Sequence, residues 1–191
     1  MGRSAGRRAV FLDRDGTLNV EVNYLHRIED LVLVAGAARA ISALNRAGWL
    51  VIVVTNQAGI ARGYYDETAL HTLHEHLTQA LAAQDARIDA IYYCPHHPDF
   101  SGTCECRKPQ PGMLLQAAAE HGIDLTRSWL VGDTGGDIGA GRAAGCRTVL
   151  VRSGYGAAYE DQVRDGDGAQ PDAIVDDVAA AVEYILAHDR V

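Results

Sequence analysis

Two aspartates stand one residue apart in the segment 11–19, FLDRDGTLN, where a short apolar run ends. Residues two apart in an extended chain point to the same side, so we expect Asp13 and Asp15 to present their carboxylates together. Carboxylates this close repel unless a cation or a shared proton lies between them, and Mg2+ meets that need while keeping water and phosphate in its shell. Gly16 permits a sharp turn, and Thr17 adds a hydroxyl and loop amides for an anion. The segment predicts a magnesium and phosphate site, with an ordinary acidic turn as the alternative.

Three later segments carry polar groups that would complete such a site. Residues 55–57, TNQ, follow a second apolar run and offer a hydroxyl and two amides to phosphate oxygens, although a plain polar turn has the same composition. Lys108 is the only lysine among 17 basic residues, and its compact ammonium has three donors. We expect Asp133 to bind the metal held by Asp13, and Asp137 to be the N-cap of a helix. Together these residues predict phosphoryl transfer.

A second cluster lies between positions 94 and 106 and contains three of the four cysteines. In a reducing compartment, closely spaced cysteines and histidines are better explained by zinc than by disulfides. Cys94, His96, Cys104 and Cys106 would form a closed tetrahedron with no open position, which predicts a structural ion. His97 could replace His96 as the fourth ligand. The Cys-x-Cys spacing could instead be redox-active, but no thioredoxin-like pattern accompanies it.

Length and composition indicate an ordinary globular protein, with 191 residues of which 48% are hydrophobic and 22% charged. We expect a single domain spanning residues 1–191. The net charge of -8 argues against a nucleic-acid binder, because such proteins rely on cationic patches. No apolar run approaches the roughly 18 residues of a membrane span, and too few apolar residues follow Arg3, Arg7 and Arg8 for a signal peptide. These features predict a cytoplasmic protein that binds no membrane.

Strand-like and helix-like segments alternate along the chain, which predicts an α/β fold: a Rossmann-like three-layer sandwich with a parallel central sheet. The expected strands are Ala9–Asp13, Leu50–Thr55, Ile88–Cys94, Trp129–Asp133, Thr148–Arg152 and Ala173–Val175. The expected helices are Ala37–Ala47, Glu67–Gln84, Gly112–His121, Asp137–Ala144 and Val178–His188. The connections Gly16–Ala35 and Pro95–Pro111, the second being the zinc-binding loop after the third strand, are longer than a sheet requires. Neither is large enough for a cap domain, so we expect an open site shaped by these loops.

Other residues are not needed for the predicted chemistry. His71, His74 and His76 lie on one expected helix, and we predict that all three are solvated surface residues. Tyr64 and Tyr65 are predicted to be packing residues.

The motifs DRDGT, TNQ, the single lysine and GDTGGD resemble, in this order, the four motifs of the haloacid dehalogenase superfamily of phosphatases. More narrowly, FLDRDGTLN, TNQAGIARG, CPHHPD and CECRKPQPGM resemble the bacterial D-glycero-D-manno-heptose 1,7-bisphosphate 7-phosphatases, and the histidinol-phosphate phosphatases are close relatives with a similar zinc loop. The resemblance covers about residues 9 to 152. It implies Mg2+-dependent hydrolysis of the 7-phosphate through an aspartyl-phosphate, or hydrolysis of histidinol phosphate or another small phosphate ester by the same mechanism.

The resemblance also implies roles for individual residues. Asp13 would be the nucleophile, and Asp15 would protonate the leaving oxygen and then activate water. Mg2+ would be held by Asp13, the backbone carbonyl of Asp15, and Asp133. Thr55 and Lys108 would stabilise the transferring phosphoryl group.

Substrate contacts are implied in the same way. Arg107 is expected at the second phosphate or the sugar, and residues 21–24 are expected to face the sugar. Zinc would rigidify the loop that positions Arg107 and Lys108. Two positions depart from the family pattern, since Thr134 stands where a lysine is often found and Ala58 where a serine often is. The expected substrate-binding residues are Glu21, Val22, Asn23, Tyr24, Asn56, Gln57, Ala58, Arg107 and Thr134.

A hypothesis from another functional class is a non-catalytic, zinc-stabilised binding module on a phosphatase scaffold. The presence of Asp13, Asp15, Lys108 and Asp133 in one chain favours the enzyme. The expected partner is a small sugar phosphate, the expected cofactors are catalytic Mg2+ and structural Zn2+, and we expect a monomer.

Overall fold

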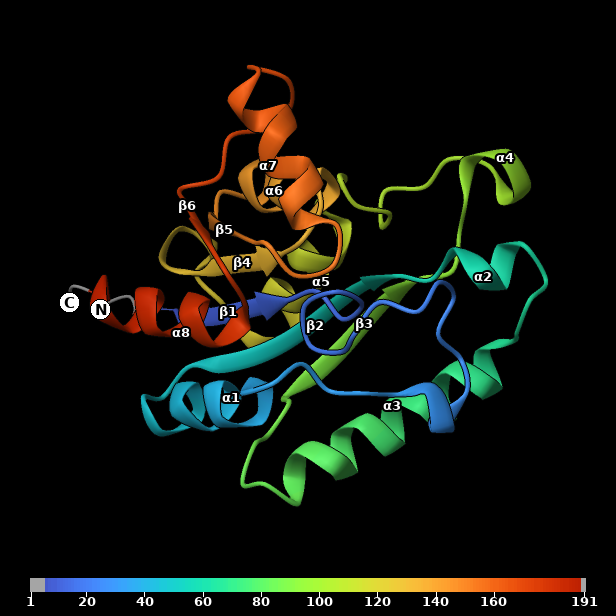
Figure 1. The fold of residues 1–191 in the computed structure, drawn as a ribbon, viewed down its shortest axis with the longest axis horizontal. Coiled ribbons are helices and arrows are strands. Elements are labelled where there is room, and N and C mark those ends of the chain that lie inside the picture. Colours follow the sequence, from blue (N-terminus) through green and yellow to red (C-terminus); the bar gives the residue numbers. More distant parts are fainter. Residues whose placement is uncertain (1–5, 190–191) are drawn as a thin grey trace.

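The structure, a computed structural model, describes residues 6–189. In this part of the chain six parallel strands form one sheet in the order β3-β2-β1-β4-β5-β6 (Figure 1). The strands are β1 (Ala9–Leu12), β2 (Leu50–Asn56), β3 (Ala90–Cys94), β4 (Trp129–Gly132), β5 (Arg147–Val151) and β6 (Ala173–Val175). The predicted parallel sheet is confirmed, with strand ends that differ from the expected ones by one or two residues.

Helices and short helical turns connect the strands. The helices are α1 (Ala37–Arg46), α2 (Ala58–Ala61), α3 (Glu67–Ala82), α4 (Pro98–Ser101), α5 (Gly112–His121), α6 (Gly135–Ala144), α7 (Gly156–Arg164) and α8 (Val178–Ala187), and 3-10 turns lie at Ile28–Asp30 and Leu125–Arg127. The five expected helices are present, and the additional ones are α2, α4 and α7.

Helices cover both faces of the sheet, which explains why its strands are apolar throughout. On one face, Leu12 and Val53 belong to a buried cluster with residues of α1, α3 and α8. On the other face, Phe11 and Ile52 belong to a cluster with residues of α5 and α6. Neighbouring residues of one strand thus enter different cores, as the pleat of a β-strand requires. The rigid centre of the sheet, β1 and β2, is where the polar loops begin.

Two helix starts differ from the sequence prediction for local reasons. α6 begins at Gly135 because Thr134 is its N-cap and Asp137, expected to be the cap, is the third helical residue, where its carboxylate accepts from the Thr134 amide. This reciprocal arrangement is a capping box. α7 was not predicted, and it begins without a side-chain cap, since Tyr155 precedes it with no cap hydrogen bond.

The order of the strands places a ligand site at their carboxyl ends. β1 pairs with β2 on one side and with β4 on the other. Strands β1 to β3 follow one another towards one edge of the sheet and β4 to β6 towards the other, so the strand order reverses between β1 and β4. Ligands of open α/β sheets bind outside such a reversal. The two long loops, 16–35 after β1 and 95–111 after β3, begin at this edge.

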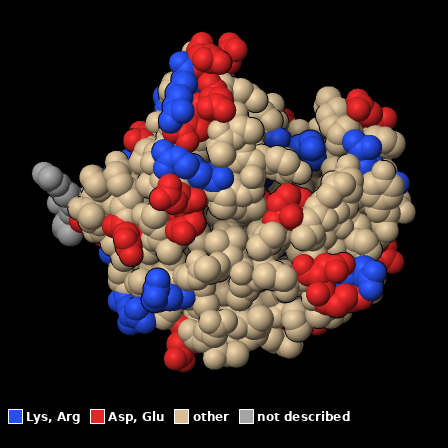
Figure 2. All heavy atoms as spheres, viewed as in Figure 1, with Lys and Arg blue, Asp and Glu red and all other residues tan. Residues whose placement is uncertain are grey.

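Acidic and basic side chains are interspersed over the face of the molecule in Figure 2, without a large area of positive charge. Among residues 6–189, the helices are all too short or too polar to cross a membrane.

Candidate active site

Three buried carboxylates meet beyond the ends of β1 and β4. Asp13 follows β1, Asp133 follows β4, and Asp137 lies in the first turn of α6; their oxygens lie within 4.8 Å of one another. Asp133 and Asp137 are fully buried and Asp13 is 7% exposed. The backbone amide of Asp13 donates to Val131 across the two strands, which fixes the position of the first carboxylate relative to β4.

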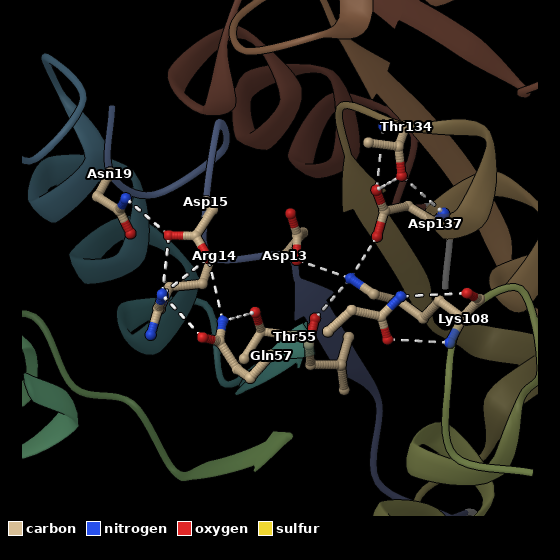
Figure 3. Close-up of polar contacts among 11 residues, drawn as sticks. Asp13, Arg14, Asp15, Asn19, Thr55, Gln57, Lys108, Thr134 and Asp137 are labelled. Carbon is tan, nitrogen blue, oxygen red and sulfur yellow. Dashed lines mark hydrogen bonds and ion pairs between the residues drawn. The ribbon is translucent and has the colours of Figure 1, made fainter. Parts of the chain in front are cut away.

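The ammonium of Lys108 lies among these carboxylates (Figure 3). Its three donors are all used: Nζ is 2.6 Å from Asp13 Oδ1, 2.5 Å from Asp137 Oδ1 and 2.8 Å from the carbonyl oxygen of Val54. The Asn56 side chain fixes the lysine backbone by accepting from its amide and donating to its carbonyl, both at 3.1 Å. The single lysine is thus placed beside Asp13, as expected from the sequence.

The charges in this cluster do not balance. Burial raises the pKa of Asp13 to about 7 against the opposing effect of Lys108. Burial and the neighbouring Asp13 carboxylate raise the pKa of Asp133 to about 8. Asp13 and Asp137 raise the pKa of Lys108 above its ordinary value despite its burial, so the ammonium keeps its proton. Three carboxylates and one ammonium leave an excess of negative charge that a cation would neutralise.

The donor set fits Mg2+, which prefers oxygen ligands and retains part of its hydration shell. Asp133 Oδ1 is buried without a hydrogen-bond partner, and Asp13 Oδ2 accepts no hydrogen bond from the described residues. Asp137 is not available, because Lys108 contacts one of its oxygens and Thr134 the other. The two free oxygens belong to the pair expected from the sequence, Asp13 and Asp133.

Glycines close the far side of Asp133. A Cβ atom at Gly16 would lie 2.2 Å from Asp133 Oδ2, and one at Gly154 would lie 2.0 Å from the same oxygen. Both glycines have positive φ, at 83° and 59°, which other residues rarely adopt. The amide of Tyr155 donates to Asp133 Oδ2 at 2.8 Å. One oxygen of Asp133 is therefore held by backbone, and the other is left for a metal.

Asp15 lies near this cluster, but its charge is balanced differently from the sequence prediction. We expected a cation shared with Asp13, whereas the carboxylate of Asp15 is bound by the guanidinium of Arg14, which is fully buried. Arg14 Nη2 lies 2.9 and 2.8 Å from the two oxygens, and Nε lies 3.1 Å from Oδ1 (Figure 3). Asn19 donates to Oδ1 at 3.1 Å. Asp15 is not part of the three-carboxylate group.

The TNQ segment contributes a further layer of contacts. Gln57 Nε2 donates to Asp15 Oδ2 at 3.0 Å and to Thr55 Oγ1 at 2.7 Å. Thr55 is 1% exposed at the end of β2, with its hydroxyl in the pocket lining. This segment is therefore not a plain polar turn, because its side chains bind the general-acid candidate and the lysine loop.

These side chains line a pocket of about 270 Å³. Every expected catalytic and substrate-binding residue lies in its wall except Val22, which is 42% exposed and lies outside. The wall also contains Asp133, which was predicted to bind the metal. Four further residues of the wall are outside the expected substrate-binding set, namely Arg62, Tyr65, His97 and Tyr155.

The first long loop approaches the pocket in a constrained conformation. Asn23 and Tyr24 both have positive φ, at 48° and 60°, which is uncommon for residues other than glycine. Glu21 accepts from the amide of Asn23 at 2.6 Å, and burial raises the pKa of this carboxyl. Strained backbone of this kind concentrates at functional sites.

Two arginines lie at the mouth of the pocket. The guanidinium of Arg107 donates to the carbonyl of His96 at 3.0 Å. Arg62 lies over the ring of Phe100 at 4.6 Å and near that of Tyr24 at 5.8 Å, and its Nε is buried without a partner. Two cations thus face the same opening from two different loops.

The cysteine cluster is assembled beside the pocket. The Sγ atom of Cys106 lies 3.0 Å from that of Cys94 and 3.3 Å from that of Cys104, and the Sγ atoms of Cys94 and Cys104 are 3.5 Å apart. All three cysteines are free thiols. Burial raises the pKa of the Cys94 thiol, so a thiolate there requires a nearby cation. Three sulfur ligands fit zinc. Neither His96 nor His97 joins the three thiols, and His97 Nε2 instead lies 3.4 Å from Arg62 Nη2.

The roles of two residues at the site, the buried His74 and the partly buried Tyr65, were not predicted. His74 is 7% exposed, not solvated, and its Nε2 lies 3.0 Å from Arg14 Nη1. Burial and the Arg14 charge lower the pKa of His74 to about 3. Tyr65 is more than a packing residue, because its hydroxyl donates to Gln57 Oε1 at 2.6 Å. Only the position of His74 on the apolar stripe of α3, four residues after Leu70, was visible in the sequence.

Comparison with known proteins gives consistent similarities. The sequence model of the HAD-hydrolase-like family matches residues 105–181. The chain is 47% identical to D-glycero-D-manno-heptose-1,7-bisphosphate 7-phosphatase of Thermosynechococcus vestitus, over 95% of this chain and 97% of that one. It is 42% identical to the D-glycero-beta-D-manno-heptose-1,7-bisphosphate 7-phosphatase of Pseudomonas aeruginosa, over 94% and 98%. The structure of D,D-heptose 1,7-bisphosphate phosphatase from B. bronchiseptica, complexed with magnesium and phosphate, matches with a TM-score of 0.85 at 35% identity, covering 94% of this chain and 98% of that one.

Proposed function

The chain belongs to the haloacid dehalogenase-like hydrolases, within the group of heptose bisphosphate phosphatases, and from this premise we propose that it removes the 7-phosphate of D-glycero-D-manno-heptose 1,7-bisphosphate. The reaction is hydrolysis of a phosphoric monoester. The observation that carries the proposal is the meeting of Asp13, Lys108 and Asp133 at the floor of one pocket with Asp15 in its wall.

Asp13 is the nucleophile in this proposal. Lys108 holds the carboxylate in place through Oδ1, and one carboxylate oxygen attacks phosphorus and forms the aspartyl-phosphate. The bond from phosphorus to the sugar oxygen breaks, and Asp15 gives that oxygen a proton. Asp15 then takes a proton from the water that hydrolyses the aspartyl-phosphate, which restores both carboxyl groups.

Positive charge and hydroxyl groups stabilise the transferring phosphoryl group. Lys108 supplies a fixed ammonium, and the Thr55 hydroxyl lies in the same wall of the pocket. Asp13, Asp133 and the backbone carbonyl of Asp15 would hold Mg2+, which would supply positive charge to offset the phosphoryl oxygens. Preorganised electrostatic stabilisation of this kind usually accounts for most of the acceleration of phosphoryl transfer.

The second phosphate is assigned to the mouth of the pocket. Arg62 and Arg107 are the cations of that region, and a guanidinium binds phosphate oxygens through two parallel donors. The strained segment at Asn23 and Tyr24 is assigned to the sugar between the two phosphates. A bisphosphate thus meets a cation at each of its ends.

Zinc is proposed at the three thiols, with the fourth ligand supplied by His96 after a change of its side-chain rotamer. The thiol cluster lies in the loop that carries Arg107 and Lys108, so the ion would hold both side chains in place. The protein is further proposed to be a monomer.

The direct experiment is phosphate release in the presence of Mg2+ from the two anomers of the heptose bisphosphate, histidinol phosphate and fructose 1,6-bisphosphate. Preference for a heptose anomer is the expected result and identifies the anomer. Preference for histidinol phosphate would retain the mechanism and overturn the substrate. The absence of release from every compound, with metals present, would favour a binding module. Asp13→Asn is the control and should release no phosphate.

A further inference from the structure

We propose that Tyr65 is a positioning residue for Asp15, and that it acts by fixing the orientation of the Gln57 carboxamide. Tyr65 OH, Gln57 and the Asp15 carboxylate form a continuous chain of hydrogen bonds at 2.6 and 3.0 Å. The inference rests on the proposed function, because it assigns a consequence to the role of Asp15 as the group that protonates the leaving oxygen.

The Gln57 side chain is saturated by protein contacts. Nε2 donates to Asp15 Oδ2 and Thr55 Oγ1, while Oε1 accepts from Tyr65 OH at 2.6 Å and from Arg14 Nη2 at 3.3 Å. Two donors and two contacts at the acceptor fill the usual hydrogen-bonding capacity of a carboxamide. Gln57 is also 2% exposed. Although it lies in the wall of the pocket, its amide has no free donor for a substrate, unlike the sequence prediction of a substrate contact.

The two ends of this carboxamide are not interchangeable. A carboxylate only accepts hydrogen bonds, so Asp15 is held correctly only when the Nε2 end faces it. Burial raises the pKa of Tyr65 to about 12, so its hydroxyl retains the proton that it donates to Oε1. The contact from Arg14 is longer, at 3.3 Å, and that guanidinium already binds Asp15. Tyr65 is therefore the principal group that keeps the amide from turning over.

The position of the Tyr65 hydroxyl is itself fixed by its neighbours. The ring stacks on His26 with centroids 5.1 Å apart and planes 9° apart. Its other neighbour is Gly59, where an added Cβ would lie 2.2 Å from Tyr65 Cε1 and 2.9 Å from the hydroxyl oxygen. A residue larger than glycine at position 59 would displace the ring, so Gly59 provides the space that the Tyr65 ring occupies.

The consequence for catalysis concerns one oxygen of Asp15. Asn19 and Arg14 Nε contact Oδ1, whereas Oδ2 is contacted by Gln57 Nε2 at 3.0 Å and by Arg14 Nη2 at 2.8 Å. A carboxamide that turned over would direct Oε1 at Oδ2 and repel it, and the carboxyl group would shift from the orientation needed to deliver its proton. The Thr55 hydroxyl, which accepts from the same Nε2, would lose this donor too, but that loss affects every phosphate ester alike.

The experiment compares two leaving groups, since a sugar alkoxide needs a proton from Asp15 and p-nitrophenolate does not. Tyr65→Phe removes only the hydroxyl and should lower kcat/KM for the sugar phosphate about three- to tenfold, the effect of one lost hydrogen bond. This ratio reports the steps up to release of the sugar, whereas the later activation of water by Asp15 is common to both substrates. For p-nitrophenyl phosphate, kcat/KM should change less than about twofold. Gln57→Leu should show the same selectivity with a larger loss. Tyr64→Phe is the matched control, because that neighbouring ring is 55% exposed and its hydroxyl makes no hydrogen bond to the described residues.

A second measurement does not depend on turnover. In the unliganded protein, the side-chain NH2 of 15N-labelled Gln57 should exchange slowly with solvent, and Tyr65→Phe should accelerate that exchange. An unchanged Gln57 signal in Tyr65→Phe, or equal losses of kcat/KM on both substrates, would overturn the positioning role. A wild-type protein that hydrolyses no substrate would refute the proposed function, while the exchange measurement would still decide whether Tyr65 orients Gln57.

Discussion

The ammonium of Lys108 lies 2.6 Å from the carboxylate of Asp13, and both groups are buried. The pair comes from segments 95 residues apart and forms where the lysine loop passes over the end of β1. Because Asp137 contacts the same ammonium, Lys108 is the only cation that contacts both carboxylates among the described residues. Its removal should therefore affect folding as well as catalysis.

Lys108→Met should lower the free energy of unfolding by about 3 kcal/mol at pH 7.5 without added metal, the usual cost of leaving a buried charge unpaired. The carboxyl groups freed of their partner can be protonated, and protonation removes the repulsion. Since a raised carboxyl pKa favours the folded state at low pH, the loss should shrink towards pH 5. Urea unfolding of the wild type and Lys108→Met at both pH values measures this difference in the free energy of unfolding. The double variant Lys108→Met/Asp137→Asn should recover part of the stability, and a loss independent of pH would contradict the explanation.

Asp133→Asn should abolish Mg2+ binding while preserving the fold. The amide oxygen of the variant can still accept from Tyr155, but the unpaired charge at Oδ1 is gone. Mg2+ at about 100 times its dissociation constant should stabilise the wild type by about 2.7 kcal/mol and leave the variant unchanged. Thermal unfolding with and without Mg2+ measures both. Equal stabilisation of the two proteins would place the ion elsewhere.

His74 should make the protein less stable in acid. Its pKa is about 3 in the folded state against an ordinary 6.5, so below pH 6.5 the unfolded chain binds a proton that the folded chain does not. Stability should fall as the pH decreases from 6.5 towards 3, by at most about 1.4 kcal/mol per pH unit. His74→Gln keeps an acceptor for Arg14 and should remove this dependence. Unfolding of the exposed-site control His76→Gln should follow the wild type, and an unchanged slope in His74→Gln would refute the assignment.

Zinc content should depend on the cysteine cluster. The wild type should contain about one zinc per chain, and Cys106→Ser should lose it, because thiolates are the preferred ligands. Loss of the ion should also lower thermal stability and weaken activity through the loop that carries Lys108. Cys146→Ala is the matched control, since this buried cysteine is not part of the thiol group. Elemental analysis that finds equal zinc in both variants would exclude the three-thiol site.

Arg107→Ala should discriminate between bisphosphate and monophosphate substrates. If its guanidinium binds the second phosphate, KM for the heptose bisphosphate should rise about 10- to 100-fold, the effect of one charge-assisted hydrogen bond. KM for heptose 7-phosphate should change little, because that substrate has no second phosphate. The exposed Arg127→Ala serves as the control. Parallel increases for both substrates would instead place Arg107 at the transferred phosphate.

The sequence predicted the floor of the site because its residues follow strand ends. Asp13, Thr55 and Asp133 come directly after or end apolar runs, and parallel strands bring their carboxyl ends to one edge whatever the details of packing. The group of three thiols was predictable for a different reason, since its three cysteines lie close together in the chain.

The supporting residues were not predictable in this way because their partners are distant in sequence. Arg14 reaches His74 across 60 positions, and only the packing of α3 against the first loop shows that the two meet. Tyr65 and Asp15 are linked by hydrogen bonds to opposite ends of the Gln57 carboxamide, and these contacts cannot be read from the sequence. The ion pair of Asp15 with Arg14, in place of a metal ion shared with Asp13, was likewise visible only in the three-dimensional structure.

The presence of a single lysine makes this protein a favourable subject for spectroscopy. Isotope labelling with 15N- or 13C-lysine would introduce one labelled side chain, and that side chain lies against Asp13, the proposed nucleophile. Its ammonium signal would be free of overlap and would respond to each change at phosphorus. A phosphate analogue, a metal ion or the covalent intermediate could then be followed through one resonance, without any engineered probe.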